Sequence, residues 1–180
     1  MKKDPVYKLV FTALMAALVC VATFLRFPLL GSKVHLGNTL CLLAGLLLGG
    51  GAGGLAAGIG SALNDLVSGY PIDEVLVTFV SKFLMALICA ALVGKSEKRV
   101  RMLIGCAVGA FSYVALYMLK TFVYRRFIYA YPLDAVRATM LSKLPASLIN
   151  AVFALVVAPI LYSALRPALQ KAGLLQKMKP

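Results

Sequence analysis

The sequence predicts an all-α integral membrane protein with six transmembrane helices. Three observations carry this prediction: 62% of the 180 residues are hydrophobic, only 14% are charged, and the mean hydropathy is +0.92. A soluble domain has about 45–50% apolar and about 25% charged residues. The apolar residues lie in long uncharged runs, so lipid is the expected solvent. A disordered chain, a coiled coil and a typical cytosolic enzyme are excluded.

Each expected helix is an apolar run, and about 20 such residues span a bilayer. The first, at about 6–26, has no small-residue cleavage site, so we expect it to be retained rather than removed as a signal peptide. Residues 34–64 carry no charge and are too long for one span. Glycines at 49–54 predict a break there. The other expected helices lie at about 36–49, 52–68, 74–94, 101–124 and 141–165, with Pro145 in the first turn of the last.

Two further patterns concern packing. Gly50, Gly54 and Gly58 recur at every fourth residue, a spacing that lets helix backbones approach closely. The four cysteines lie in apolar runs without CxxC spacing, which indicates buried, reduced thiols.

The net charge of +13 is unevenly placed along the chain. More than half of the 19 Lys and Arg lie near the N-terminus, in residues 95–101 and in the C-terminal tail. A six-helix topology puts these segments on one face, which the positive-inside rule assigns to the cytoplasm together with both termini. The basic excess therefore suits anionic lipid headgroups, and no nucleic-acid partner is expected. We expect residues 1–180 to form one transmembrane domain.

Polar residues inside a membrane span are costly and indicate function. Here they form stripes at helical spacing on four of the expected helices. The stripe residues taken as substrate-binding candidates are Asn64 and Asp65; Thr78 and Lys82; Tyr113, Tyr117 and Lys120; and Lys143, Ser147 and Asn150.

The depth of these stripes predicts a pocket. At 1.5 Å per residue, Lys82, Tyr113 and Asn150 lie roughly 12–17 Å below the outer helix ends, near the middle of the core of about 30 Å. The inner halves of the same helices carry no charge. This pattern favours a pocket that is open to the outside and closed toward the cytoplasm. Tyrosine rings, amides and lysines suit a small ring-containing ligand with an electron-rich or acidic part, although single lysines near helix ends also snorkel to the interface.

Catalysis and resident cofactors have little support. The chain has one His and no paired intramembrane carboxylates, so neither a multi-His metal site nor a familiar catalytic constellation is present. It also lacks the GxxxxGK[ST] phosphate loop. We expect no enzyme activity, no cofactor and no metal, and we expect a partner to supply the energy for transport.

Several motifs together resemble the substrate-binding S components of energy-coupling factor (ECF) vitamin transporters, closest to the riboflavin-type and general branches. They are Ala13-x-x-x-Ala17, Val34-His-Leu-Gly-Asn38, the glycine-rich string of residues 45–71, Thr78-Phe-Val-Ser-Lys82 and Leu144-Pro-Ala-Ser-Leu-Ile-Asn150. The glycine string followed by Asn-Asp and then Ser-Lys is the most specific. Asn38 stands where many relatives have an acidic residue.

The resemblance implies a bacterial plasma-membrane protein that captures a vitamin or precursor from outside and topples within the membrane to deliver it. A transmembrane coupling subunit and two cytoplasmic ATPases would be its partners. It places Ala13 and Ala17 at the coupling-subunit interface. Residues 26–35, with Pro28, Gly31 and Lys33, would form a lid, and His35 and Asn38 join the candidate ligand contacts. The candidate ligands are riboflavin, pyridoxine-type compounds, a thiamine precursor, pantothenate and folate.

Two other functions remain open from the sequence. A membrane scaffold of cell-envelope assembly has a similar six-helix build and would carry only a shallow pocket. A small membrane enzyme is the other, and it would need a set of catalytic residues that the sequence does not reveal.

Overall fold

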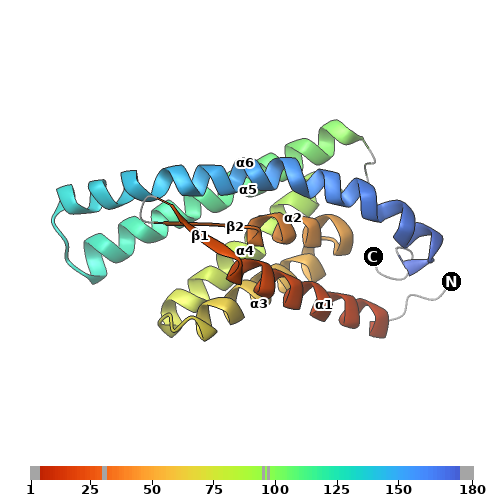
Figure 1. Ribbon diagram of the computed structural model, residues 1–180, viewed down its shortest axis with the longest axis horizontal. Helices are drawn as coiled ribbons and strands as arrows, with labels where there is room; N and C mark the ends of the chain where they lie inside the picture. Colours follow the sequence, from red (N-terminus) through yellow and green to blue (C-terminus); the bar gives the residue numbers. More distant parts are fainter. Residues whose placement is uncertain (1–4, 30–31, 95, 97, 175–180) are drawn as a thin grey trace.

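The computed structural model describes residues 5–29, 32–94, 96 and 98–174. These residues form six α-helices, one β-hairpin and one π-helical turn (Figure 1). The helices are α1 (Pro5–Phe24), α2 (Gly37–Leu48), α3 (Gly50–Val67), α4 (Ile72–Val93), α5 (Arg99–Val123) and α6 (Leu133–Lys171). The hairpin strands are β1 (Arg26–Leu29) and β2 (Ser32–His35), and the π-helical turn is η1 (Tyr124–Ile128). The expected lid residue Gly31 and the cytoplasmic-face lysines Lys2, Lys3, Lys95, Lys177 and Lys179 lie outside the described residues.

The helices run alternately in opposite directions along the long axis (Figure 1). The first residues of α1 and the last residues of α6 lie at one end, which we call the terminal end. The hairpin, the α3–α4 turn and η1 lie toward the other, which we call the hairpin end.

Four helical segments of the described chain are long and apolar enough to cross a membrane: α1, α4, α5 with η1, and α6. The helix α2 is shorter, with 12 residues. Gly49 separates it from α3 with a φ of 79°, a left-handed conformation that glycine adopts without strain. The break expected in the long uncharged run therefore lies at this glycine.

The largest difference from the expected bounds concerns α6, which begins at Leu133 rather than near residue 141. Pro132 precedes the helix and Asp134 lies in its first turn, where a carboxylate interacts favourably with the helix dipole. Pro145 consequently lies inside the helix and not in its first turn. The expected loop at 125–140 is mostly helical, because η1 continues α5 to Ile128 and α6 begins directly after Pro132.

The segment between α1 and α2 is a strand pair rather than an irregular loop. Its strands are antiparallel, with Arg26 opposite His35 and Phe27 opposite Val34. Each strand has only four residues, at the lower limit of the length over which alternation can identify a strand in a sequence.

The contact between α3 and α4 explains the glycine repeat. A Cβ added to Gly54 or Gly58 would lie 2.9 Å from the ring of Phe83 or Phe79 of α4. The two rings stack with centroids 6.2 Å apart and fill the groove that the glycines leave. The expected close approach is confirmed at these positions.

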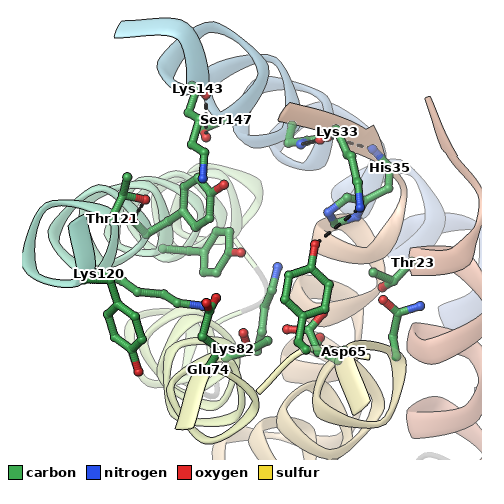
Figure 2. A pocket seen from close by; sticks show the side chains of 18 of the residues that line it. Thr23, Lys33, His35, Asp65, Glu74, Lys82, Lys120, Thr121, Lys143 and Ser147 are labelled. Atoms are coloured by element: carbon green, nitrogen blue, oxygen red, sulfur yellow. Dashed lines mark hydrogen bonds and ion pairs between the residues drawn. The ribbon is translucent and has the colours of Figure 1, made fainter. Parts of the chain in front are cut away.

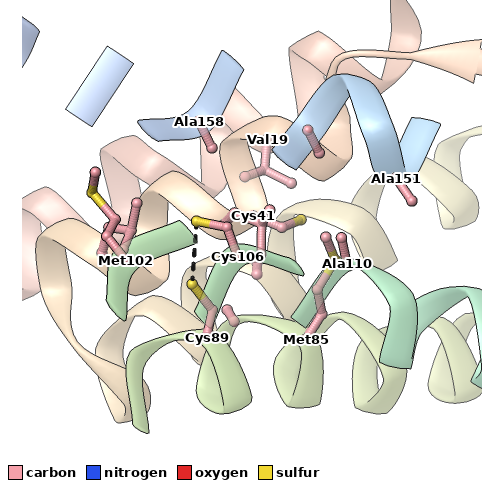
Figure 3. Close-up of a cluster of buried hydrophobic side chains, with 14 of the residues drawn as sticks. Val19, Cys41, Met85, Cys89, Met102, Cys106, Ala110, Ala151 and Ala158 are labelled. Carbon is pink, nitrogen blue, oxygen red and sulfur yellow. Dashed lines mark hydrogen bonds between the residues drawn. The ribbon is translucent and has the colours of Figure 1, made fainter. Parts of the chain in front are cut away.

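The core toward the terminal end is apolar and built from small or sulfur-containing side chains (Figure 3). Met85 and Cys89 of α4 meet Cys106 and Ala110 of α5, all four fully buried. The cysteines are free thiols, and all but the partly exposed Cys20 are buried.

Candidate ligand-binding site

A cavity of about 510 Å³ lies at the hairpin end, within the usual size range of small-molecule sites. Side chains from the hairpin and from α2 to α6 line it. All of the predicted substrate-binding residues meet there, although they come from widely separated parts of the chain. They are His35, Asn38, Asn64, Asp65, Thr78, Lys82, Tyr113, Tyr117, Lys120, Lys143, Ser147 and Asn150.

Lys82 is the most deeply placed charge of the cavity. Its side chain is only 3% exposed. The Nζ donates a hydrogen bond to Oδ1 of Asn38 and lies 3.6 Å from the centroid of the Tyr113 ring. Both of these close partners are neutral, so the nearest contacts of the ammonium are a dipole and a ring face. Such a group is ready to receive an electron-rich atom of a ligand.

Two tyrosines of α5 form an aromatic wall. Tyr113 and Tyr117 lie one helical turn apart, with ring centroids 6.2 Å apart and planes inclined by 24°. The Nζ of Lys143 on α6 lies 5.6 Å from the Tyr117 centroid. Figure 2 shows Lys143 reaching into the cavity from the opposite side to Lys82. The wall can stack a flat ring whose substituents reach the lysines.

The outer rim contains the cavity's ion pair. Lys120 of α5 bonds Glu74 of α4 with an N–O distance of 2.9 Å. Both side chains are largely covered, at 14% and 20% exposure. Tyr129 donates a 3.5 Å hydrogen bond to the same carboxylate. This pair joins α4 to α5 at the mouth and neutralises Lys120.

Asn150 attaches the hairpin to α6. Its Oδ1 accepts a 2.9 Å hydrogen bond from the backbone N–H of His35, and its Nδ2 donates a 2.8 Å bond to the carbonyl of Lys33. Arg26 also donates to Ser68, and Lys33 to the hydroxyl of Tyr70. The hairpin is therefore held against α6 and the α3–α4 turn, where it closes one side of the cavity.

His35 lies in this hairpin contact as a neutral imidazole. Its Nδ1 accepts a 3.1 Å hydrogen bond from the backbone N–H of Gly37. Burial lowers its pKa from 6.5 to about 3, and the positive charges of Lys82, Arg26 and Lys33 act in the same direction. A proton on Nδ1 would break the bond to Gly37, so the docked hairpin requires the neutral ring.

Asn64 presents an unsatisfied acceptor. The residue is fully buried, and its Nδ2 donates to the carbonyl of Cys20 over 3.5 Å. Its Oδ1 has no hydrogen-bond partner in the described part of the chain. Because a buried polar atom without a partner is costly, a donor group of a ligand would be favoured here.

The cavity also contains residues outside the predicted set. Glu74 extends the Thr78 and Lys82 stripe by one turn, so helical spacing could have identified it. Tyr129 and Tyr131 lie beyond η1, where the sequence predicted a loop and offered no periodicity. The other additions are Thr23, Arg26, Lys33, Ser61, Tyr70, Thr121, Tyr124 and Arg125.

The two alanines expected at a subunit interface lie outside the cavity. Ala13 and Ala17 are exposed on α1, while Met15, Ala16 and Val19 of the same helix face the core. No group of three or more His, Cys, Asp or Glu side chains that could hold a metal ion occurs among the residues described.

Similarity to known proteins in sequence and structure identifies the family. Residues 3–167 match the family described as ECF-type riboflavin transporter, S component. A solved S component of a bacterial ECF transporter superposes with a TM-score of 0.73 at 18% identity, covering 92% of this chain and 99% of that one. No curated protein matches the sequence. Members of this family are substrate-binding subunits of membrane transporters and are not enzymes, and the chain belongs to this family of S components.

Proposed function

We propose that this chain captures a water-soluble vitamin or vitamin precursor in the cavity at the hairpin end and delivers it to an ATP-driven ECF module. The observation that carries the proposal is the convergence of all the predicted stripe residues, from four helices, on one cavity. The family match supports the transport role. The scaffold alternative is not favoured by that match.

We infer the orientation of the chain in the membrane from the distribution of its positive charges. All six helices would lie in the bacterial plasma membrane, with α2 and α3 as short spans, and the basic terminal end would face the cytoplasm. The cavity would then open to the outside. The apolar, closely packed half beneath it would block passage through the chain, so delivery needs a partner rather than a channel.

The partners would be a transmembrane coupling subunit and two cytoplasmic ATPases. The exposed alanines of α1 support a contact there, because small side chains allow a second helix to approach closely.

Two measurements test this function. The purified chain is titrated with a panel of B vitamins, starting with riboflavin, whose fluorescence reports stacking on tyrosine. We expect at least one ligand to bind with a Kd below about 1 μM, or about −8 kcal/mol. Failure of every vitamin and precursor at that level would contradict the proposal.

The second measurement separates binding from assembly. Ala13→Phe or Ala17→Phe should abolish copurification with the coupling subunit and leave vitamin affinity unchanged. The lipid-facing change Val21→Phe on the same helix, at a residue 58% exposed, serves as the control and should preserve both.

A further inference from the structure

The charges of the cavity do not balance. Among the residues that the structure describes, six basic side chains line it against two acidic ones, Asp65 and Glu74. The labelled lysines of Figure 2 come from four different elements, β2, α4, α5 and α6, and surround one space.

Most of these cations lack a carboxylate partner. Within the described chain, Lys120 is the cavity lysine that has one, Glu74 at 2.9 Å. Lys33 donates over 3.3 Å to the neutral hydroxyl of Tyr70, and Lys82 to the neutral amide of Asn38. The half-buried Lys143 has the Tyr117 ring face, with the Nζ 5.6 Å from its centroid.

An uncompensated positive cavity between apolar helices is unfavourable, because charge repulsion is poorly screened where water is scarce. A negatively charged ligand removes that cost and gains charge-assisted hydrogen bonds. The tyrosine wall of α5 lies directly beside two of the lysines, since Lys82 and Lys143 each lie over one of its rings. A ring and an acidic group can therefore be held at the same time.

We propose that the ligand is an aromatic-ring compound bearing a carboxylate or phosphate, with the ring on Tyr113 and Tyr117 and the acidic group at Lys143. This inference rests on the proposed vitamin-capture function and narrows it to acidic members of that class. Neutral vitamins of the same ring type bind more weakly because they leave the lysines uncompensated.

Matched pairs test this inference. The probes are nicotinamide and nicotinate, pyridoxine and pyridoxine 5′-phosphate, and riboflavin and riboflavin 5′-phosphate. Each is titrated by calorimetry into the full chain in detergent free of anionic lipid, at low and high salt. We expect the acidic member of the best-binding pair to bind at least about tenfold more tightly, consistent with one charge-assisted hydrogen bond, and the preference to shrink in salt.

Two variants locate the acidic group. Lys143→Gln should remove most of that preference, because it should weaken binding of the acidic member far more than binding of the neutral one. Lys98→Gln, an exposed lysine at the terminal end, should change neither. Equal or tighter binding of the neutral member, or an acid preference that survives Lys143→Gln, overturns the inference while vitamin capture stands. If no member of any pair binds and the B-vitamin panel also fails, vitamin capture itself is rejected.

Discussion

The two ends of the helix bundle use the same helices for opposite purposes. At the hairpin end α4, α5 and α6 present Lys82, Tyr113 and Asn150 to a polar cavity. Toward the terminal end the same helices contribute Cys89, Cys106 and Ala158 to a core without buried charge among the described residues. In the proposed function, ligand recognition and closure of the bundle are separated by depth along each helix. Changes at one end should therefore affect binding, and changes at the other should affect stability.

The largest effect on stability should come from Gly109→Leu, which overpacks the apolar core toward the terminal end. A Cβ at this position would lie 2.8 Å from the backbone oxygen of Met85 and 3.1 Å from the Cβ of Cys89, so α4 and α5 must separate. We expect a loss of about 3 kcal/mol or more in the free energy of unfolding, the upper part of the range for overpacking. Thermal unfolding in detergent measures it. The lipid-facing Val108→Leu is the control. If Gly109→Leu lowered the ligand affinity without lowering the unfolding temperature, the separation of binding and stability between the two ends would be contradicted.

The next effect should follow from Lys82→Met in the polar half. Loss of a buried charge-assisted contact should weaken ligand binding about 10- to 100-fold. The unfolding temperature should stay close to that of the unchanged protein, because removing a buried charge offsets the donor that Asn38 loses. Ligand binding and thermal unfolding are measured in parallel on the variant. A variant that fails to fold would show that Lys82 serves stability rather than ligand binding.

A smaller effect is expected from Asn150→Ala, which removes both hydrogen bonds to the hairpin. Each is worth about 0.5–1.5 kcal/mol, so undocking should become roughly tenfold more frequent and the ligand should dissociate faster. Hydrogen exchange of the His35 amide reports the undocking. Ser142→Ala on the same helix is the matched control, and equal exchange in the two variants would show that Asn150 does not hold the hairpin.

The smallest effect is a pH dependence of the hairpin contact. The pKa of His35 is about 3 in the docked hairpin and near 6.5 when free, so the undocked state binds more protons between these values. Docking is therefore fully favourable above about pH 6.5 and weakens as the pH falls toward 3. The protection factors of the hairpin amides, which are the intrinsic hydrogen-exchange rates divided by the observed rates at each pH, should be lower at pH 5 than at pH 7, and His35→Gln should remove this difference. Protection factors that do not change with pH in either protein would assign the hairpin contact to Asn150 alone.

The sequence predicted the polar stripes correctly because a helix fixes which residues share a face. Lys82 could be placed near the middle of its helix from spacing alone, whereas the depth of Asn150 was counted from residue 141, eight residues after α6 begins. The hairpin could not be predicted, since its strands are held by contacts with Asn150, Ser68 and Tyr70 from distant segments. The early start of α6 could not be predicted because Asp134 and Arg137 interrupt the apolar run, and charged residues need not coincide with a helix end. The vitamin that the chain captures and its delivery to a partner stay predictions.

The central claim is that the polar cavity holds a small ligand. It is tested most directly by mass spectrometry of small molecules released from the purified chain and from Lys82→Met prepared side by side. We expect the unchanged protein to release a ring-containing compound that is depleted at least about tenfold in the variant, the loss that one charge-assisted contact implies. Equal amounts from both proteins, or no such compound from either, would contradict the account.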